Sequence, residues 1–506
     1  MARKMTLSID TLRQLAGDMW WSWNEIGQRP FLALDPTLWE AVNHNPTAML
    51  RRVPEAVIAQ RLEEPGYQRV LADAVAARDA YYKRAKTQAG KGKRKKRVRV
   101  AYFCSEFAVH ESLQQYSGGL GVLAGDHVKS ASDLNVPLVG VGLFYRQGFY
   151  LQQLRSDGTT RIVRPELDPR DLPVQDTGMI IRCPIGRRTI AARIWSLQVG
   201  RSVLYLLDSD VKENRPEDRR ITQALYQGEP RERLYQQVLL GVGGMMALEA
   251  LGERPTIYHS NEGHAAFAAL YRVACLMRAG RSQNKAIEQV RRTTVFTTHT
   301  PVEAGHDRYE MRDANAALGG VLRIGEMNKR DLVALGGEQS SSGDMRLCMT
   351  VLALNLSGFV NGVSKIHGDV SRTMWQKVYA GAPTVGEVPI TSVTNGVHVG
   401  TWLDPLAESF WQKEARIRLT HSAVPSAHMW KRAEGVDAAA FWALRRRLRE
   451  RLIWIVRYRQ VLQARRRGAG PAELAAVGKG LDPDVLTIGF ARVWQCISGP
   501  TCCFQI

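Results

Sequence analysis

Short apolar runs alternate with longer amphipathic stretches through the middle of the chain. Such runs are typical of buried strands, and the stretches between them, including residues 235–251 and 263–279, are typical of helices. Regular alternation of the two predicts an open, mostly parallel α/β sheet with helices on its faces. The predicted strands are residues 98–103, 136–144, 203–207, 256–259 and 293–298.

Both ends of the chain depart from this alternation. Residues 1–82 predict a helical leader domain whose Trp-rich segment, residues 19–23, we expect to pack in a core. Residues 83–99 carry ten basic side chains and no acidic one, which predicts a linker. Residues 100–435 hold the α/β pattern, 436–480 a connecting helix region with a long basic helix, and 481–492 a further strand at 485–490.

Composition narrows the class of protein. The 506 residues, 45% hydrophobic and 23% charged, suit a folded chain with several cores. The net charge of +20 favours anionic ligands without identifying one. No run approaches the roughly 20 apolar residues of a membrane span and no secretory signal is visible, so we expect a cytoplasmic protein without a membrane partner. Seven cysteines without C-x-x-C spacing predict reduced thiols, not disulfides or a zinc site.

A glycine-rich segment, residues 116–127, lies between a predicted strand and a predicted helix. Its Gly118, Gly119 and Leu120 would offer backbone N–H groups to a phosphate or a sugar oxygen at the helix N-terminus. The spacing misses the dinucleotide fingerprint by one residue, which disfavours hydride chemistry. A tight turn without a ligand is the alternative.

Three polar clusters occur where strands should end. Residues 259–264 include Glu262 and His264, residues 297–306 include His299, and residues 394–398 include Asn395. Ligands of parallel sheets bind beyond the carboxyl ends of the strands, so the clusters predict a shared sugar site. The same His and Glu side chains are potential metal ligands, but no zinc-type spacing repeats, and we expect no metal. Neither a G-x-S-x-G elbow nor a Walker A motif is present.

Taken together, these motifs resemble those of α-glucan (glycogen, starch or maltodextrin) phosphorylases of the divergent bacterial and archaeal branch. The resemblance runs from about Leu12 to Arg492, and each motif is weak alone. The motifs are the Trp-rich leader with residues 44–46, the strand at 101–107, the loop at 118–121, and the segments 261–264, 298–301, 361–367 and 394–398.

This resemblance implies a GT-B type glycosyltransferase with two Rossmann-like domains. Its activity would be phosphorolysis of the terminal α-1,4-linked glucose of a glucan to glucose 1-phosphate, with inorganic phosphate as the second substrate. The family uses pyridoxal 5'-phosphate through its phosphate group. Family analogy also implies a homodimer.

Motif matches carry the family's site onto this chain. Gly118, Gly119 and Leu120 would bring backbone donors to phosphate and sugar, and His299 would hydrogen-bond the glucose. The other matches are Asn395 on a glucose hydroxyl, Glu262 and His264 in the same pocket, and Trp402 beside the cofactor.

The last residues depart from the family pattern. Family members continue past Arg492 with a basic segment that holds the substrate phosphate and with a second domain that carries the cofactor lysine. Residues 493–506 have instead a Cys-rich tail. We therefore expect a truncated second domain, from a shifted reading frame or a truncated gene, and a chain that lacks the cofactor lysine and is inactive unless completed.

Two other functions are consistent with the sequence. A nucleotide-sugar glucosyltransferase of the glycogen synthase type shares an early GGLG loop, but not the leader or the order of the clusters. A non-catalytic glucan-binding remnant would keep only one sugar-facing wall. The basic linker permits a nucleic-acid patch, but no binding module with interleaved aromatics follows it, so we expect no nucleic-acid partner.

Overall fold

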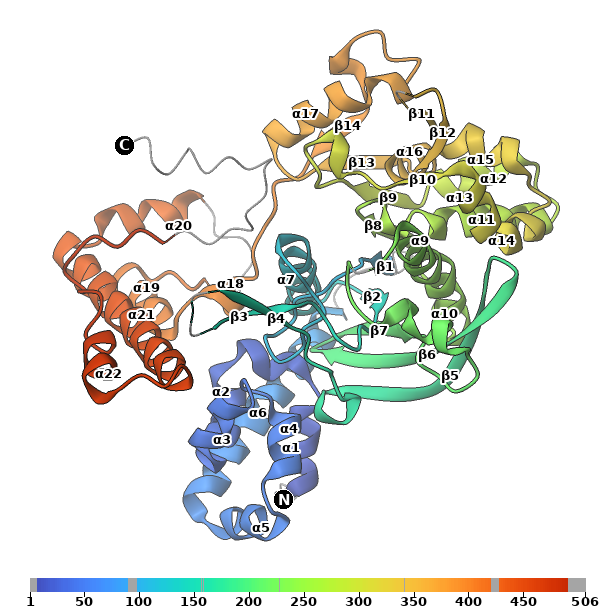
Figure 1. Cartoon of the computed structure of the whole chain (residues 1–506). Helices are drawn as coiled ribbons and strands as arrows, with labels where there is room; N and C mark the ends of the chain where they lie inside the picture. Colours follow the sequence, from blue (N-terminus) through green and yellow to red (C-terminus); the bar gives the residue numbers. More distant parts are fainter. Residues whose placement is uncertain are drawn as a thin grey trace. The chain divides into compact units, whose positions relative to one another are not determined.

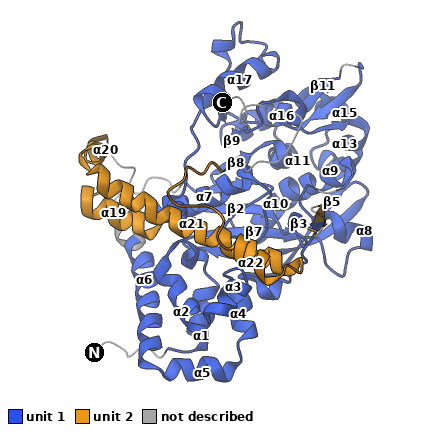
Figure 2. Cartoon of the chain, turned by 60° about the vertical axis from the view of Figure 1, so that its left-hand side comes forward, with its two compact units in different colours: residues 1–152, 162–402 blue, residues 153–161, 403–506 orange. Residues whose placement is uncertain are grey.

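The structure is a computed structural model, and it describes residues 7–89, 98–155, 157, 159–226, 228–340, 342–419 and 427–489. The chain forms two compact units (Figure 2). Unit 1 comprises residues 1–152 and 162–402, and unit 2 comprises residues 153–161 and 403–506. The boundary at 402 falls before the predicted one at 435, and the leader belongs to the same compact unit as the sheet.

A nine-stranded sheet forms the centre of unit 1 (Figure 1). Its order is β14-β13-β9-β8-β1-β2-β7-β6-β5, in which the first seven strands run parallel and the last two pairings are antiparallel. All five predicted strands are present, as β1, β2, β7, β8 and β9. The strand bounds are β1 (Val100–Phe103), β2 (Leu138–Leu143), β5 (Val174–Ile185), β6 (Arg188–Val199), β7 (Ser202–Asp208), β8 (Ile257–Asn261), β9 (Thr294–Thr297), β13 (Phe359–Gly362) and β14 (Ile390–Ser392).

Alternate residues of the central strands enter two different cores. In β1, Ala101 and Phe103 pack into one core and Tyr102 into the other, which Cys104 directly after the strand also enters, as the period of two requires. The first core contains apolar side chains of α9–α11 and of the helices that follow. The second contains those of α7 and of the leader. Central strands buried on both faces explain the apolar runs in the sequence.

The leader is helical, as predicted, and it covers the second core. Trp20, Trp21 and Trp23 are all less than 9% exposed, which confirms the core interpretation of the Trp-rich segment. Two of the leader helices start at an Asx-Pro pair, where the Asp35 and Asn45 side chains cap the first turn. The elements are α1 (Ile9–Ala16), η1 (Met19–Trp23), α2 (Glu25–Leu34), α3 (Pro36–Ala41), α4 (Pro46–Arg52), α5 (Glu55–Glu63) and α6 (Pro65–Ala89).

Helix α6 extends to Ala89, so residues 83–89 of the predicted linker are helical, while residues 90–97 lie outside the described residues. The remaining helices of unit 1 flank the large sheet and a small one, β10 (Arg308–Glu310), β12 (Met345–Cys348) and β11 (Gly337–Gln339). They are α7 (Gly119–Asp133), α8 (Pro216–Arg219), α9 (Pro230–Val238), η4 (Leu239–Gly243), α10 (Gly244–Ala250), η5 (Gly263–Ala265), α11 (Phe267–Arg278), α12 (Gln283–Arg291), α13 (Met311–Ala317), α14 (Gly319–Ile324), α15 (Lys329–Gly336), α16 (Met349–Asn355), α17 (Lys365–Trp375) and α18 (Val399–Trp402).

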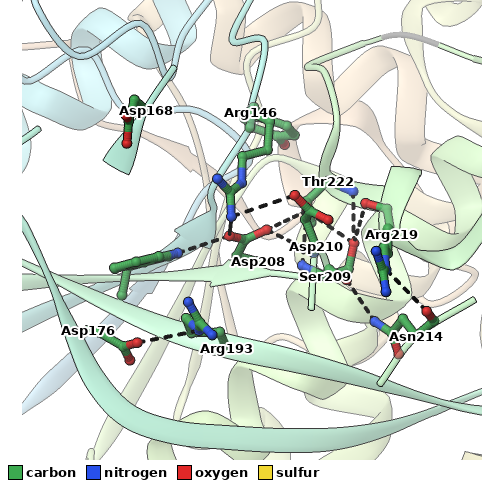
Figure 3. Close-up of polar contacts among 12 residues, drawn as sticks. Arg146, Asp168, Asp176, Arg193, Asp208, Ser209, Asp210, Asn214, Arg219 and Thr222 are labelled. Atoms are coloured by element: carbon green, nitrogen blue, oxygen red, sulfur yellow. Dashed lines mark hydrogen bonds and ion pairs between the residues drawn. The ribbon is translucent and has the colours of Figure 1, made fainter. Parts of the chain in front are cut away.

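A buried polar network closes the carboxyl end of β7 (Figure 3). Asp208 is fully buried, and its Oδ2 accepts from Arg146 at 2.7 Å and from Trp195 Nε1 at 3.0 Å. Its Oδ1 accepts from the Asp210 N–H at 2.9 Å and from the Thr222 hydroxyl at 3.3 Å. Because the buried Asp208 carboxylate accepts from Asp210 and Thr222, it fixes the position of the loop that leads from β7 towards α9.

Unit 2 is mainly helical over its described residues and also contains part of a two-stranded hairpin, β3 (Leu151–Leu154) and β4 (Thr160–Val163). Its helices are α19 (Pro405–Ala415), α20 (Ala427–Lys431), α21 (Ala438–Arg466) and α22 (Pro471–Val477). The long basic helix predicted in the connecting region is α21. The predicted strand at 485–490 is not formed over 485–489, because no described strand pairs with it, and Phe490 and the tail 491–506 lie outside the described residues.

The described helices include none that is both long and apolar enough to cross a membrane.

Candidate functional site

Two of the predicted clusters meet at the carboxyl ends of β8 and β9. These strands pair in parallel, with Asn261 opposite Thr297. Beyond Asn261 the chain turns sharply at Glu262, whose φ of 71° is unusual for a residue with a side chain. Glu262 and His299 therefore follow adjacent strands and lie side by side.

A cavity of about 360 Å³ opens at this end of the sheet. Four of the predicted site residues, Leu120, Glu262, His264 and His299, line it. They come from the first turn of α7, from η5 and its approach, and from the loop after β9. The other lining residues are Tyr226, Arg233, Gly263, Thr300, Pro301, Gly305, His306, Asp307, Met349 and Thr350. A volume of this size suits a ligand of one or two sugar rings.

His299 is held from two sides. Its Nε2 lies 2.5 Å from Asn261 Oδ1, and its backbone N–H donates to Glu262 Oε2 at 3.3 Å. The Thr300 hydroxyl donates to Glu262 Oε1 at 2.7 Å. Burial lowers the pKa of His299 below its usual value, and nearby His367 and His264 act in the same direction while Glu262 opposes them. The imidazole is therefore neutral near pH 7.

His264 is fixed in the opposite wall. Its Nδ1 lies 3.0 Å from Ser105 Oγ, and its Nε2 lies 3.6 Å from Asp307 Oδ2. Asp307 also accepts from Gln237 Nε2 at 2.6 Å and pairs with Arg233. Arg233 is the one cation among the described lining residues and pairs with Asp307, while Glu262 adds a second carboxylate, so the lining carries no net positive charge.

The glycine loop is organised around a carboxylate of the protein itself. Glu106, 2% exposed, accepts from the N–H groups of Ser117 at 2.7 Å and Gly118 at 3.2 Å, and from the Tyr226 hydroxyl at 2.7 Å. The N–H of Gly118 is thus occupied. The N–H groups of Gly119 and Leu120 have no partner among the described residues, so they remain available to a ligand.

Asn395 does not line the cavity. Its backbone N–H donates to the Val363 carbonyl at 3.0 Å, and the residue is exposed in the loop after β14. Trp402 is also outside, 59% exposed, with its Nε1 donating to Asp126 at 2.8 Å. The structure therefore brings together four of the eight predicted site residues and leaves Gly118, Gly119, Asn395 and Trp402 outside the cavity lining.

Five lining residues lie outside the predicted clusters, namely Tyr226, Arg233, Asp307, Met349 and Thr350. The last two begin α16. Asp307 directly follows the second polar cluster, so extending that cluster by one residue would have included it. Tyr226 lies shortly before α9, and Arg233 lies in the first turn of that helix. No local sequence pattern marks either as a site residue. Their place depends on the loop after β7, which sequence spacing does not define.

A metal ion would need a group of ligating side chains, and the expected cofactor would need a lysine amine. Over the described part of the chain, no group of three or more His, Cys, Asp or Glu side chains is placed to hold a metal ion. No lysine lines the cavity, so its described walls offer no amine for a pyridoxal imine. The described walls of this cavity therefore do not fit the attachment of pyridoxal phosphate.

Comparison with known proteins extends over most of the chain. A family model described as a protein of unknown function (DUF3417) matches residues 5–113, which comprise the leader and β1. A glycogen phosphorylase of Mycobacterium tuberculosis is 39% identical over 95% of this chain and 58% of its own length. A maltodextrin phosphorylase of Thermococcus litoralis is 34% identical over 97% of this chain and 58% of its own length. A glycogen phosphorylase of Aquifex aeolicus is 32% identical over 95% of this chain and 69% of its own length.

The chain thus spans 58% of the length of the first two of these relatives and somewhat more of the third. The matched region includes the cavity, both strand-end clusters and the glycine loop.

Proposed function

This chain belongs to the α-glucan phosphorylase family, and we propose that its cavity holds the terminal glucose of an α-1,4-glucan for attack by inorganic phosphate. The observation that carries the proposal is the convergence of Leu120, Glu262, His264 and His299 on one cavity. The product would be glucose 1-phosphate.

The lining residues suit a neutral sugar beside an anion. Neutral His299 and the bonded Glu262 would meet glucose hydroxyls, and the N–H groups of Gly119 and Leu120 would donate to a phosphate or sugar oxygen at the start of α7. His264 would line the same pocket. Gly118 would act indirectly, by holding the loop on Glu106. Asn395 would bind a glucose hydroxyl from the loop after β14.

In this proposal unit 1 is the first Rossmann-like domain of a GT-B arrangement. The family cofactor is pyridoxal 5'-phosphate, with Trp402 as its proposed neighbour, but no step is assigned to it because the described walls do not fit it. A cytoplasmic homodimer that binds no nucleic acid and no membrane completes the proposal.

Calorimetry with maltoheptaose, followed by an assay for glucose 1-phosphate, tests the proposal on the 506-residue chain. Binding, with release of glucose 1-phosphate only in the presence of inorganic phosphate, supports it. We expect His299→Ala to abolish binding, whereas His428→Ala, an exposed histidine of α20, leaves it unchanged. Transfer from ADP-glucose without phosphate would indicate a nucleotide-sugar glucosyltransferase, and failure to bind maltoheptaose would overturn the proposal.

The cavity without a lysine favours one second candidate, glucan binding without turnover by this chain alone. Binding of maltoheptaose with no release of glucose 1-phosphate supports that function. Turnover by the purified chain excludes it.

A further inference from the structure

A hydrogen-bonded chain of three side chains runs behind the cavity wall. Asn261 Nδ2 donates to Cys104 Sγ at 3.2 Å, and Asn261 Oδ1 lies 2.5 Å from His299 Nε2. Cys104 follows β1 and is fully buried, and Asn261 ends β8 and is 1% exposed. Neither side chain lines the cavity, so their effect on a ligand passes through His299.

The donors in this chain determine where the His299 proton lies. A neutral imidazole has one N–H and one bare nitrogen, and an amide oxygen only accepts. The Cys104 sulfur accepts from Asn261 Nδ2, which directs the amide oxygen towards His299. The opposite amide orientation would leave the oxygen with the thiol S–H, a far weaker donor than an imidazole N–H. The proton of His299 therefore lies on Nε2.

The backbone of His299 is held by Glu262, the residue that follows β8. Glu262 accepts from the His299 backbone N–H and from the Thr300 hydroxyl, and is itself 6% exposed. Successive residues, Asn261 and Glu262, thus clamp the ring and the backbone of His299. Nδ1 has no hydrogen-bond partner among the described residues and is not an enclosed atom, and His299 lines the cavity.

We infer that Cys104 and Asn261 are positioning residues that hold His299 as its Nε2–H tautomer, so that Nδ1 is presented to the cavity as a hydrogen-bond acceptor. A ligand group facing His299 must then be a donor, such as a sugar hydroxyl. The opposite tautomer would present an N–H and select an acceptor, such as a phosphate oxygen. The tautomer assignment does not depend on the proposed function. The identification of the group that bonds Nδ1 as a sugar hydroxyl does rest on the proposed function.

The tautomer is measurable by NMR on the full chain labelled with ¹⁵N at histidine. His299→Gln identifies the signals of His299 by their loss. The expected spectrum has a protonated, pyrrole-like Nε2 and a bare, pyridine-like Nδ1. A protonated Nδ1, or an averaged mixture of the two tautomers, overturns the inference with no other variant needed.

Two variants distinguish positioning from a general structural role. Cys104→Ala removes the sulfur that orients the amide, so we expect a mixed His299 tautomer and a several-fold loss of maltoheptaose affinity. Cys104→Ser keeps an acceptor, but its hydroxyl is also a good donor that can bond the opposite amide orientation, so it should restore both properties only in part. Cys275→Ala, a half-buried cysteine of α11, is the matched control and should change neither. A single Nε2–H tautomer retained in a folded Cys104→Ala variant would contradict the role of the sulfur.

The two proposals fail in different ways. An Nε2–H tautomer in a chain that does not bind maltoheptaose upholds the positioning role and overturns the proposed function. Maltoheptaose binding with an Nδ1–H tautomer does the reverse.

Discussion

Two histidine clusters of unit 1, residues 297–306 and 394–398, both follow strands of the sheet. They differ in how fully the ring nitrogens of His299 and His398 are hydrogen-bonded. His398 is 4% exposed, and both of its ring nitrogens are occupied, Nδ1 by Thr401 Oγ1 at 2.8 Å and Nε2 by Asp133 Oδ2 at 3.1 Å. Its backbone N–H donates to Asp126, and its ring packs edge-on against Trp23 at 5.5 Å. His299 has only one nitrogen occupied, and the other is available in a cavity.

The difference shows what separates a site from a structural joint. Both clusters come after strands and contain Thr, Gly and His, so a motif alone treats them alike. In the second cluster the backbone and both ring nitrogens of His398 are bonded to residues of α7 and α18, and its ring packs against Trp23 of the leader. In the His299 cluster, Nδ1 of His299 has no hydrogen-bond partner among the described residues. A surplus hydrogen-bonding atom facing a cavity identifies the site.

The largest expected effect is on the stability that the contacts around His398 provide. Asp126, 4% exposed, accepts from the His398 N–H and from Trp402 Nε1, and together with Asp133 it favours the charge of Lys129, which is 2% exposed. Asp126→Ala leaves these two donors unpaired and removes one of the two carboxylates that favour the charge of Lys129, so we expect the free energy of unfolding to fall by ~2–3 kcal/mol. Urea denaturation measures it.

The exposed Asp10 of α1 supplies the control, since Asp10→Ala should cost less than ~1 kcal/mol. If Asp126→Ala also cost less than ~1 kcal/mol, the His398 cluster would not be a joint of the fold. Maltoheptaose binding by the folded fraction should persist.

Much of the fold was predictable, because buried parallel strands leave continuous apolar runs in the sequence. The hairpin β5–β6 was not predicted, although most of Arg188–Val199 is buried and burial alternates over its last five residues. Its residues contribute to both cores at the antiparallel edge of the sheet, and alternation is a weaker signal than a continuous run. Residues 485–489 show the converse error, an apolar run without a described partner strand.

The site was predictable only where it lies at strand ends. Glu262, His264 and His299 follow β8 and β9, so the parallel order of the sheet brings them together. Gly118 was expected to offer its N–H to a ligand, but Glu106, eleven residues before Ser117, accepts from this stretch instead. The spacing of residues in the sequence does not show which carboxylate will accept from the backbone N–H groups at the start of a helix.

A smaller effect is expected from pH. Burial lowers the pKa of His259 to about 3, with the nearby His127 and His299 acting in the same direction. Burial likewise lowers the pKa of His110 to about 3. Below about pH 6.5 the unfolded chain binds protons that the folded chain rejects, so stability falls as the pH drops from 6.5 towards 3. At pH 5 each histidine should cost about 2 kcal/mol.

Urea denaturation at pH 8 and pH 5 measures this loss. His259 lies behind the site, and His259→Gln should remove about half of the pH-dependent loss that the two histidines cause. An unchanged pH dependence in this variant would show that His259 is accessible to protons in the folded protein.

The smallest expected effect concerns the predicted site residue that the structure places outside the cavity. Asn395 is exposed and its described hydrogen bond is made by the backbone, so Asn395→Ala should change the free energy of unfolding by less than ~0.5 kcal/mol. If its side chain binds a glucose hydroxyl, one hydrogen bond of about 0.5–1.5 kcal/mol is lost, and maltoheptaose affinity falls about two- to tenfold. Calorimetry beside His299→Ala compares the two positions. Unchanged affinity would confine the sugar site to the cavity and leave the whole cluster at residues 394–398, which includes both Asn395 and His398, with a structural role.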